Sequence, residues 1–495
     1  MDQETQANIA ITEQGALSGT GSDVRIFRGI PYAAPPVGDL RWRPPQPPAK
    51  WEGVRAADAF GLDCLQNPRE GTRAPGRGED CLTLNVWTPA KAETEALPVM
   101  VWIHGGSYLL GSGSDIRSDG EGFARKGVVF VTFNYRLGVF GFLAHPELSK
   151  ESPNGSSSNY ALLDKIAAFR WIKRNIAAFG GDPDRVTVFG CSAGSASISL
   201  LLTSPLGEGL FDRAILESPG AFRPLASLAD AEKVGLCMGD DLTAMRAMSA
   251  EEVFARTDEF VPRVRGLTTP RVLRPIRDGW VIPEDERDAF AAGRIHALPI
   301  ITGCNTDEGS TFTNAWPIKT IEQYRQNVTE NFASHLEEAL SHYPVASEAD
   351  VPGGLAHMFG DTQFHYGSWR LAREMSGRGH KCFRYIFTRK RPGSDKPPRH
   401  TDELDYVFAR LAEAHEAGGP PFDQTDLMVS EAMQDAWIRF AALGDPNGEG
   451  LPDWPVHDRE SDPYMEFGDG LSMGAGWRDG PLSFLDRYYA RNDAA

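Results

Sequence analysis

The feature that most constrains this chain is a strand-forming run at residues 186–189 that leads directly into Gly-Cys-Ser-Ala-Gly at residues 190–194. The small and apolar residues at 195–202 predict a buried helix directly after it. Strand, G-x-S-x-G turn and helix together are typical of a nucleophile elbow, in which glycines flank the serine because a Cβ would clash there. We therefore predict that Ser192 is a nucleophile at the start of a helix.

Strand and helix patterns alternate over most of the chain. Strands are expected at 7–12, 24–32, 82–88, 98–104, 128–135, 186–190, 213–218, 298–303 and 383–388, and helices at 160–179 and 431–443. Residues 225–295 and 320–380 contain further helical pieces, and no internal repeat or low-complexity linker occurs. This order predicts an α/β fold in one domain, residues 1–495, with a large, mostly parallel central sheet flanked by helices and with helical insertions.

Composition excludes several classes of protein. Hydrophobic residues at 41% and charged residues at 24% are ordinary for a soluble globular chain. A formal net charge of −18 argues against nucleic acid and anionic membrane surfaces as partners. No apolar stretch reaches the roughly 18 residues of a membrane span, and the first residues are too polar for a signal peptide. We expect a soluble protein, cytoplasmic unless a signal peptide was removed, in which case secreted or periplasmic.

The six cysteines are too few for a disulfide scaffold, and no C-x-x-C pair suggests a zinc or thioredoxin-type site. Cys64 and Cys81 enclose a short loop rich in glycine, proline and arginine, so we expect a disulfide between them. The chemistry of a serine nucleophile requires no metal and no organic cofactor.

A serine nucleophile also needs a hole for the oxyanion. His-Gly-Gly-Ser-Tyr at residues 104–108 directly follows an expected strand, and its glycines let backbone N–H groups converge. We expect the N–H groups of Gly106, Ser107 and Ala193 to hold the oxyanion.

The acid and the base are expected after the serine in the chain, in that order. The turn at residues 303–309 follows a strand and contains Asp307 and Glu308, either of which could serve on chemistry alone. His400 lies downstream of this turn and after a strand, whereas His104 precedes the serine. His400 is therefore the expected base among the eleven histidines.

These parts together resemble the type-B carboxylesterase/cholinesterase family of α/β-hydrolases, from about residue 8 to about residue 445. Its serine signature is unbroken at residues 179–194, and its second signature is present as Glu-Asp-Cys-Leu-Thr-Leu-Asn-Val at residues 79–86. The resemblance implies the α/β-hydrolase fold, an active-site gorge bordered by the insertions, and hydrolysis of carboxylic esters through an acyl-enzyme. It further implies Glu308 as the acid, His400 as the base, a Cys64–Cys81 bridge, and the ion pairs Arg41–Glu79 and Arg136–Asp164.

Within the family the chain resembles bacterial fumonisin esterases, in the stretches 143–155, 201–206, 218–228, 349–352 and 359–364. Those enzymes remove tricarballylic acid arms from a long amino-polyol toxin, which implies a substrate whose acyl part carries free carboxylates. Guanidinium groups bind carboxylates with two parallel hydrogen bonds. We therefore expect a clamp formed by Arg223, Arg271, Arg274 and Arg277.

Two positions depart from the family pattern. Ser107 stands where the third glycine of the loop is usual, and Cys191 stands where a glutamate usually precedes the nucleophile.

Alternative functions are a broad-specificity carboxylesterase, a carbamate or amide hydrolase on the same triad, and a non-catalytic, adhesion-type relative. The filled triad positions disfavour the last, and the oligomeric state is left open.

Overall fold

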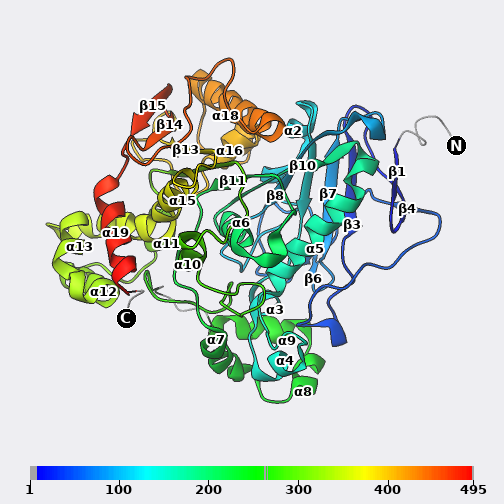
Figure 1. Cartoon of the computed structure of the whole chain (residues 1–495), viewed down its shortest axis with the longest axis horizontal. Coiled ribbons are helices and arrows are strands. Elements are labelled where there is room, and N and C mark those ends of the chain that lie inside the picture. The colour runs from blue at the N-terminus through cyan, green and yellow to red at the C-terminus, as the bar shows by residue number, and fades with distance from the viewer. Residues whose placement is uncertain (1–7, 261–263, 265, 493–495) are drawn as a thin grey trace.

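The computed structural model describes residues 8–260, 264 and 266–492, and a large sheet lies at its centre (Figure 1). Within these residues ten strands form this sheet. From one edge to the other they are β3 (Arg25–Pro31), β7 (Thr83–Thr88), β9 (Val129–Phe133), β8 (Leu97–Ile103), β10 (Gly181–Cys191), β11 (Arg213–Glu217), β12 (Ile300–Asn305), β13 (Cys382–Phe387), β14 (Pro463–Phe467) and β15 (Leu471–Ala475).

The strands from β9 to β14 run parallel to their neighbours, whereas β3–β7, β7–β9 and β14–β15 are antiparallel pairs at the edges. Every residue of β9 and of β12 is buried. Such fully buried strands are expected where helices cover both faces of a parallel sheet. The predicted α/β fold with a mostly parallel central sheet is confirmed.

The two-residue period of a strand divides the core into two layers. In β8, Val99, Val101 and Ile103 pack into one hydrophobic cluster, while Met100 and Trp102 pack into the other. The first cluster includes residues of α5 (Tyr160–Asn175), α6 (Ala193–Thr203) and α15 (Tyr366–Ser376). The second includes residues of α2 (Glu121–Arg125), α16 (Leu404–Val407) and α18 (Gln424–Leu443).

Shorter helices fill the insertions. Residues 225–295 contain α7 (Leu228–Gly235), α8 (Leu242–Ala247), α9 (Ala250–Ala255) and α10 (Glu286–Ala291), and the second insertion contains α11 (Ser310–Thr313), α12 (Ile321–Phe332), α13 (Leu336–His342) and α14 (Val351–Gly360). A π-helical turn at Asp361–His365 joins α14 to α15. The remaining elements are β1 (Ile9–Thr12), β2 (Gly15–Ser18), β4 (Val54–Ala56), β5 (Asp63–Cys64), β6 (Arg77–Gly78), α3 (Gly138–Phe142), α4 (Pro146–Glu151), α17 (Leu411–Glu416) and α19 (Asp479–Asn492).

Two helix boundaries differ from the sequence-based expectation, and some elements at the C-terminal end were not expected. The helix expected over 160–179 changes to a 3₁₀ turn after Asn175 and stops at Gly180, whose φ is 79°. The helix expected from residue 431 begins at Gln424, because Asp423 caps it by accepting from the N–H of Thr425 at 2.8 Å. The strands β14 and β15 and the helix α19 were not predicted.

Two buried ion pairs hold the segments that precede Ser192 in the chain. Arg41 binds Glu79 through Nη2 and Oε2 at 2.6 Å, and Arg136 binds Asp164 through Nη2 and Oδ1 at 2.7 Å. Both pairs use two nitrogens of the guanidinium, which fixes its plane. The two ion pairs implied by the family resemblance are therefore confirmed.

The expected disulfide is absent from the structure, where Cys64 and Cys81 are both free, buried thiols. The two side chains are hydrogen-bonded to each other, and the backbone N–H of Leu137 donates to the Cys64 sulfur at 3.2 Å. The sequence argument thus paired the right cysteines in space, but the covalent bond is not formed.

Among the helices that the structure describes, none combines the length and the apolar character needed to cross a bilayer.

Candidate active site

Ser192 lies in the turn between β10 and α6, with φ of 59° and ψ of −118°. A positive φ is costly for a residue with a Cβ, and such strain is concentrated at functional sites. A Cβ on Gly190 would lie 2.7 Å from the carbonyl oxygen of Ile103, and one on Gly194 would lie 2.0 Å from it. The close approach of β8 therefore requires both glycines and holds Ser192 at the N-terminus of α6.

Glu308 and His400 lie in loops that follow the neighbouring strands β12 and β13. Nδ1 of His400 is hydrogen-bonded to Oε2 of Glu308, whose Oε1 accepts from Ser218 Oγ at 2.6 Å and from Asn305 N at 2.7 Å. Burial acts to raise the pKa of Glu308, but the charge and hydrogen bond of His400 outweigh it and hold that pKa below its ordinary value. Because the ionised carboxylate only accepts, Nδ1 of His400 carries the proton and Nε2 is left to act as a base.

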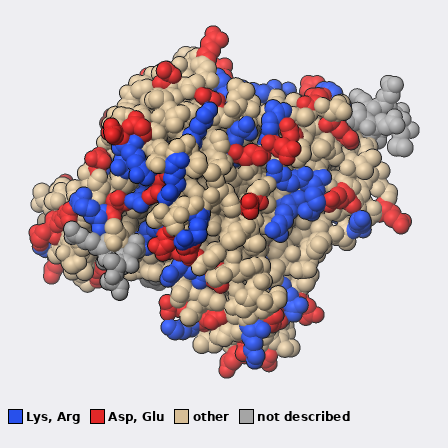
Figure 2. All heavy atoms as spheres, in the orientation of Figure 1, with Lys and Arg blue, Asp and Glu red and all other residues tan. Residues whose placement is uncertain are grey.

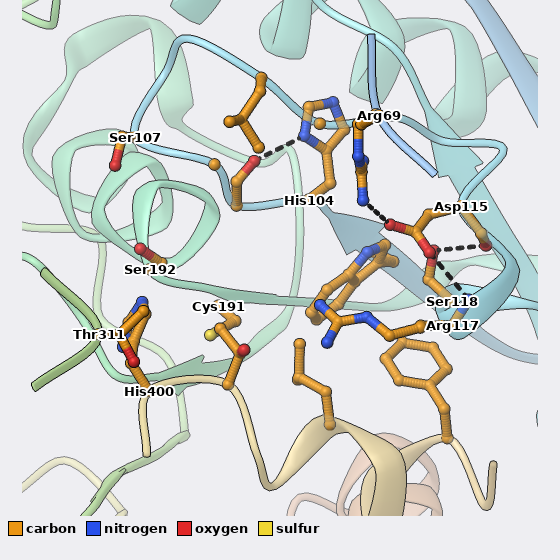
Figure 3. Close-up of a pocket in the computed structure, with 18 of the residues that line it drawn as sticks. Arg69, His104, Ser107, Asp115, Arg117, Ser118, Cys191, Ser192, Thr311 and His400 are labelled. Carbon is orange, nitrogen blue, oxygen red and sulfur yellow. Dashed lines mark hydrogen bonds and ion pairs between the residues drawn. The ribbon is translucent and has the colours of Figure 1, made fainter. Parts of the chain in front are cut away.

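Ser192 and His400 line the same cavity, whose volume is about 270 Å³ (Figure 3). The ring of Phe364 stacks on His400 with centroids 4.3 Å apart, and the centroid of Phe312 lies 5.0 Å from that of His400. These packed rings restrict the orientation of the imidazole. A hydroxyl nucleophile and a base on one cavity, with a buried acid orienting the base, can carry out acyl transfer.

A second histidine, His104, lines this cavity but lacks an acid. Burial lowers the pKa of His104 to about 3, and its ring stacks on Tyr135 with centroids 4.3 Å apart. Its Nδ1 lies 2.9 Å from the carbonyl oxygen of Gly105, and within the described chain no carboxylate is hydrogen-bonded to the ring. His104 is therefore neutral and fixed in place, whereas His400 has the environment of a base.

The glycine-rich loop after β8 has an unusual backbone. Gly106, Ser107 and Tyr108 have consecutive φ values of 109°, 57° and 66°. A Cβ on Gly106 would lie 2.0 Å from the carbonyl oxygen of Leu110, whereas Ser107 adopts a positive φ in spite of its side chain. In the residues that the structure describes, the N–H groups of Gly106, Ser107 and Ala193 donate to no protein acceptor. Unpaired N–H groups next to a nucleophile can stabilise an oxyanion.

Two buried glutamates near the site were missed by the sequence analysis. Oε1 of Glu403 lies 3.8 Å from the sulfur of Cys191, and Oε2 of Glu403 accepts from the side-chain amide of Asn305. Burial, and next the charge of Glu308, raise the pKa of Glu403 to about 7. The three-residue spacing from His400 was the one sequence signal for this residue.

Glu217 is the second of these glutamates. Its Oε1 accepts from the indole Nε1 of Trp437 at 2.7 Å, and its other oxygen has no hydrogen-bond partner among the described residues. Burial, and next the charge of Glu403, raise the pKa of Glu217 well above its ordinary value. Nothing in the sequence around Glu217 distinguished it from an ordinary strand residue.

One wall of the cavity carries charged side chains that the sequence analysis did not single out. Arg69 forms an ion pair with Asp115, and Asp115 Oδ1 also accepts from the backbone N–H of Arg117 at 2.9 Å. Figure 3 shows the side chain of Arg117 extending from this wall toward Cys191. No sequence motif marked these residues, which precede and follow the glycine-rich loop.

Among the described residues, none of the four expected substrate-binding arginines lines this cavity: Arg223, Arg271, Arg274 and Arg277. The first two donate to Oε1 of Gln363, at 2.6 and 2.7 Å, and the third lies over the ring of Tyr108. Arg271 and Arg274 line a neighbouring cavity of about 300 Å³, which meets the first at Ser107. Arg277 is exposed and lines neither cavity.

One cluster of side chains has the composition of a metal site. Ligand atoms of Cys304, Glu308 and His365 lie within 4.8 Å of one another. Both ring nitrogens of His365 are already engaged, Nδ1 with Asp361 Oδ1 and Nε2 with the carbonyl oxygen of Asn305, each at 2.8 Å. Both oxygens of Glu308 also accept hydrogen bonds, so this donor set is better suited to supporting the acid than to binding a metal.

Comparison with known proteins agrees with this geometry. The model of the carboxylesterase family matches residues 6–485. The chain is 46% identical to a fumonisin B1 esterase of Sphingopyxis macrogoltabida over 473 residues, which cover 94% of this chain and 87% of the relative. It is 36% identical to the para-nitrobenzyl esterase of Bacillus subtilis (strain 168) over 474 residues, covering 92% and 93% of the two chains.

The fold of the chain is also that of solved esterases. A PNB esterase structure superposes with a TM-score of 0.85 at 32% identity, covering 96% of this chain and 98% of the other. The carboxylesterase of Geobacillus stearothermophilus gives a TM-score of 0.83 at 33% identity, covering 96% and 99%. The chain therefore belongs to the carboxylesterase family, and it is a carboxylic ester hydrolase with an α/β-hydrolase fold.

Proposed function

We propose that ester hydrolysis proceeds through an acyl-enzyme on Ser192, with His400 as general base and Glu308 as the orienting acid. The observation that carries this proposal is the hydrogen bond between His400 Nδ1 and the ionised, buried Glu308, beside a cavity that Ser192 also lines. His400 accepts the Ser192 proton as the hydroxyl attacks the ester carbonyl, and then protonates the leaving alcohol. Water repeats the same two steps to release the acid.

The oxyanion of each tetrahedral intermediate is held by the N–H groups of Gly106, Ser107 and Ala193. Their lack of protein acceptors supports this role, as does the position of Ala193 at the N-terminus of α6, where the helix dipole favours negative charge. The positive φ of Ser107 keeps the loop in a glycine-like conformation although the third glycine of the family is missing.

The substrate class that we propose is the tricarballylate side-chain ester of a fumonisin-type mycotoxin. The 46% identity to a protein named fumonisin B1 esterase supports this choice. The neutral cysteine at position 191 supports it as well, because burial raises the pKa of the Cys191 thiol well above its ordinary value. An acyl group that carries free carboxylates would be repelled by a glutamate beside the nucleophile, and it meets no such charge here.

The decisive experiment compares the wild-type protein and Ser192→Ala on a fumonisin-type tricarballylate ester and on a neutral 4-nitrophenyl ester. We expect kcat/KM to be at least about 100-fold higher for the tricarballylate ester, and both activities to fall by about 10⁴-fold in the variant. Comparable kcat/KM values for the two esters would refute the substrate class while leaving the triad standing. Undiminished activity of Ser192→Ala would refute the triad.

A second candidate is a carboxylesterase of broad specificity. The apolar lining of the cavity favours it, since Trp102, Leu110, Leu404 and Phe408 border the space beside Ser192. The para-nitrobenzyl esterase among the relatives is consistent with such a pocket. The comparison of the two esters described above distinguishes this candidate from the first.

A further inference from the structure

The molecule as a whole does not attract anions. Its formal net charge is −18, and Figure 2 shows positive and negative side chains interspersed over the face in view. Charges separated by more than about 10 Å are largely screened at physiological salt. Recognition of an anionic ester therefore requires a cation within the catalytic cavity itself.

The cavity that contains Ser192 has an excess of positive charge. Of its lining residues, Arg69 and Arg117 are cationic, and Asp115 is the sole acid among those that the structure describes. Asp115 is already paired with Arg69, as the dashed line in Figure 3 marks. The cavity wall thus retains one positive charge that no lining acid neutralises, and that charge is on Arg117.

The guanidinium of Arg117 has no hydrogen-bond or ion-pair partner within the described part of the chain, where Arg117 donates only through its backbone N–H. Its backbone is nevertheless well fixed, because Asp115 caps the short 3₁₀ turn Ile116–Ser118. The side chain is solvent-accessible and extends toward Cys191 beside the nucleophile (Figure 3). An exposed head group on an ordered backbone can bind a ligand without first breaking an internal ion pair.

No acid among the described residues forms an ion pair with the guanidinium of Arg117. Cys191 and His104 are neutral at pH 7, because burial raises the pKa of the first and lowers that of the second. Asp405 attracts Arg117 electrostatically, but it forms no hydrogen bond with the Arg117 guanidinium, its Oδ2 accepts from Arg391 at 3.2 Å, and it does not line the cavity. The guanidinium is therefore able to form an ion pair with a carboxylate that enters the cavity.

We propose that Arg117 is a specificity-determining residue that binds a free carboxylate of the acyl group while the ester carbonyl lies at Ser192. The inference rests on the proposed function and deepens it, because it assigns the anion-binding role to a residue outside the arginines expected from the sequence. Arg271, which is held by Gln363 in the neighbouring cavity, provides a natural comparison. Two parallel hydrogen bonds from one guanidinium would fix the acyl group in register with the nucleophile.

The test uses free tricarballylate as a competitive inhibitor of 4-nitrophenyl butyrate hydrolysis, which reports anion binding without requiring an anionic substrate. We expect the inhibition constant to rise by about 10- to 100-fold in Arg117→Gln, as is typical for the loss of a charged hydrogen-bonding partner. Arg117→Lys retains the charge but not the fork of donors, so an intermediate increase is expected. Arg325→Gln, a change in an exposed ion pair on α12, should leave the inhibition constant at the wild-type value.

The outcomes separate this inference from the proposed function. An inhibition constant in Arg117→Gln within about twofold of wild type overturns the role of Arg117, as does a larger increase in Arg271→Gln than in Arg117→Gln. The ratio of kcat/KM for the tricarballylate ester to that for the butyrate ester, measured in the wild-type protein alone, tests the substrate class. A wild-type protein that binds tricarballylate through Arg117 but shows no preference for its ester would refute only the substrate class.

Discussion

Replacing Glu308 with glutamine tests whether the buried carboxylate orients the base. Glu308 is 1% exposed, and four donors converge on it: His400 Nδ1, Ser218 Oγ at 2.6 Å, Asn305 N at 2.7 Å and Asn305 Nδ2 at 3.4 Å. A glutamine of the same shape has one acceptor oxygen and one NH₂ group. If the NH₂ group faces His400, the ring must accept at Nδ1 and carry its proton on Nε2, the nitrogen that has to accept the Ser192 proton.

The expected loss follows from this change of tautomer. Equivalent carboxylate-to-amide changes in serine hydrolase triads lower kcat by about 10⁴-fold, which corresponds to about 5.5 kcal/mol of activation free energy. Folding should suffer less, because an unsatisfied buried hydrogen-bonding group costs about 1–3 kcal/mol. We therefore expect a folded protein with nearly unchanged KM and a greatly reduced kcat.

The assay is 4-nitrophenyl butyrate hydrolysis by purified wild type, Glu308→Gln and Asp307→Asn, with circular dichroism to verify folding. Asp307 is the matched control, because it is the neighbouring acid of the same turn and its Oδ1 accepts from the N–H groups of Gly309 and Ser310. Its variant should retain kcat within about threefold. A Glu308→Gln protein that keeps more than about a tenth of the wild-type kcat would refute the assignment of the orienting acid.

Three further changes have defined outcomes. The pKa of Glu403 in the folded protein is raised to about 7, whereas its ordinary value is about 4.5. Ionisation of Glu403 therefore destabilises the fold as the pH rises from about 4.5 to about 7. Glu403→Gln should raise Tm relative to wild type at pH 8 but not at pH 4.5. At roughly 3 kcal/mol of linked free energy the effect is several degrees, and an equal Tm difference at both pH values would contradict it. Oxidation of the purified protein should join Cys64 to Cys81 and stabilise the fold by about 3 kcal/mol. Thiol titration in denaturant should then find two fewer free thiols. An unchanged number of free thiols would show that the pair does not oxidise. Gly194→Ala should lower Tm strongly, because the added Cβ would lie 2.0 Å from a carbonyl oxygen of β8. Gly353→Ala should leave Tm nearly unchanged, because no atom lies within 4 Å of the added Cβ. Equal Tm values for the two variants would contradict the steric argument.

Elements that are determined by residues adjacent in the chain could be predicted from the sequence. The nucleophile elbow could be predicted because its strand, glycines and helix are adjacent in the chain, and the structure has them where expected. Chemistry alone left Asp307 and Glu308 as equal candidates for the acid. The structure distinguishes them because the shorter side chain folds back onto its own turn, while the longer one reaches His400.

Features that depend on contacts between residues far apart in the chain could not be predicted from the sequence. Glu217 is significant because Trp437, 220 residues later, donates to it, and no local pattern reports such a contact. Arg117 is positioned through Asp115, which is held by Arg69 from a loop 46 residues earlier. The strands β14 and β15 are five residues each and contain proline and glycine, so their pairing with the sheet edge depends on β13 rather than on their own pattern.

The cysteine at position 191, where the family usually has a glutamate, affects both the surroundings of the base His400 and those of Arg117. A glutamate there would add a fourth carboxylate to the buried group that Glu217, Glu308 and Glu403 already form, and ionising it so close to them would be costly. It would also place a charge of opposite sign near Arg117. Cysteine avoids both consequences, because its thiol stays neutral. The same substitution thus lowers the negative charge around the base and leaves the guanidinium available, and this is the combination that an ester with a carboxylated acyl group requires.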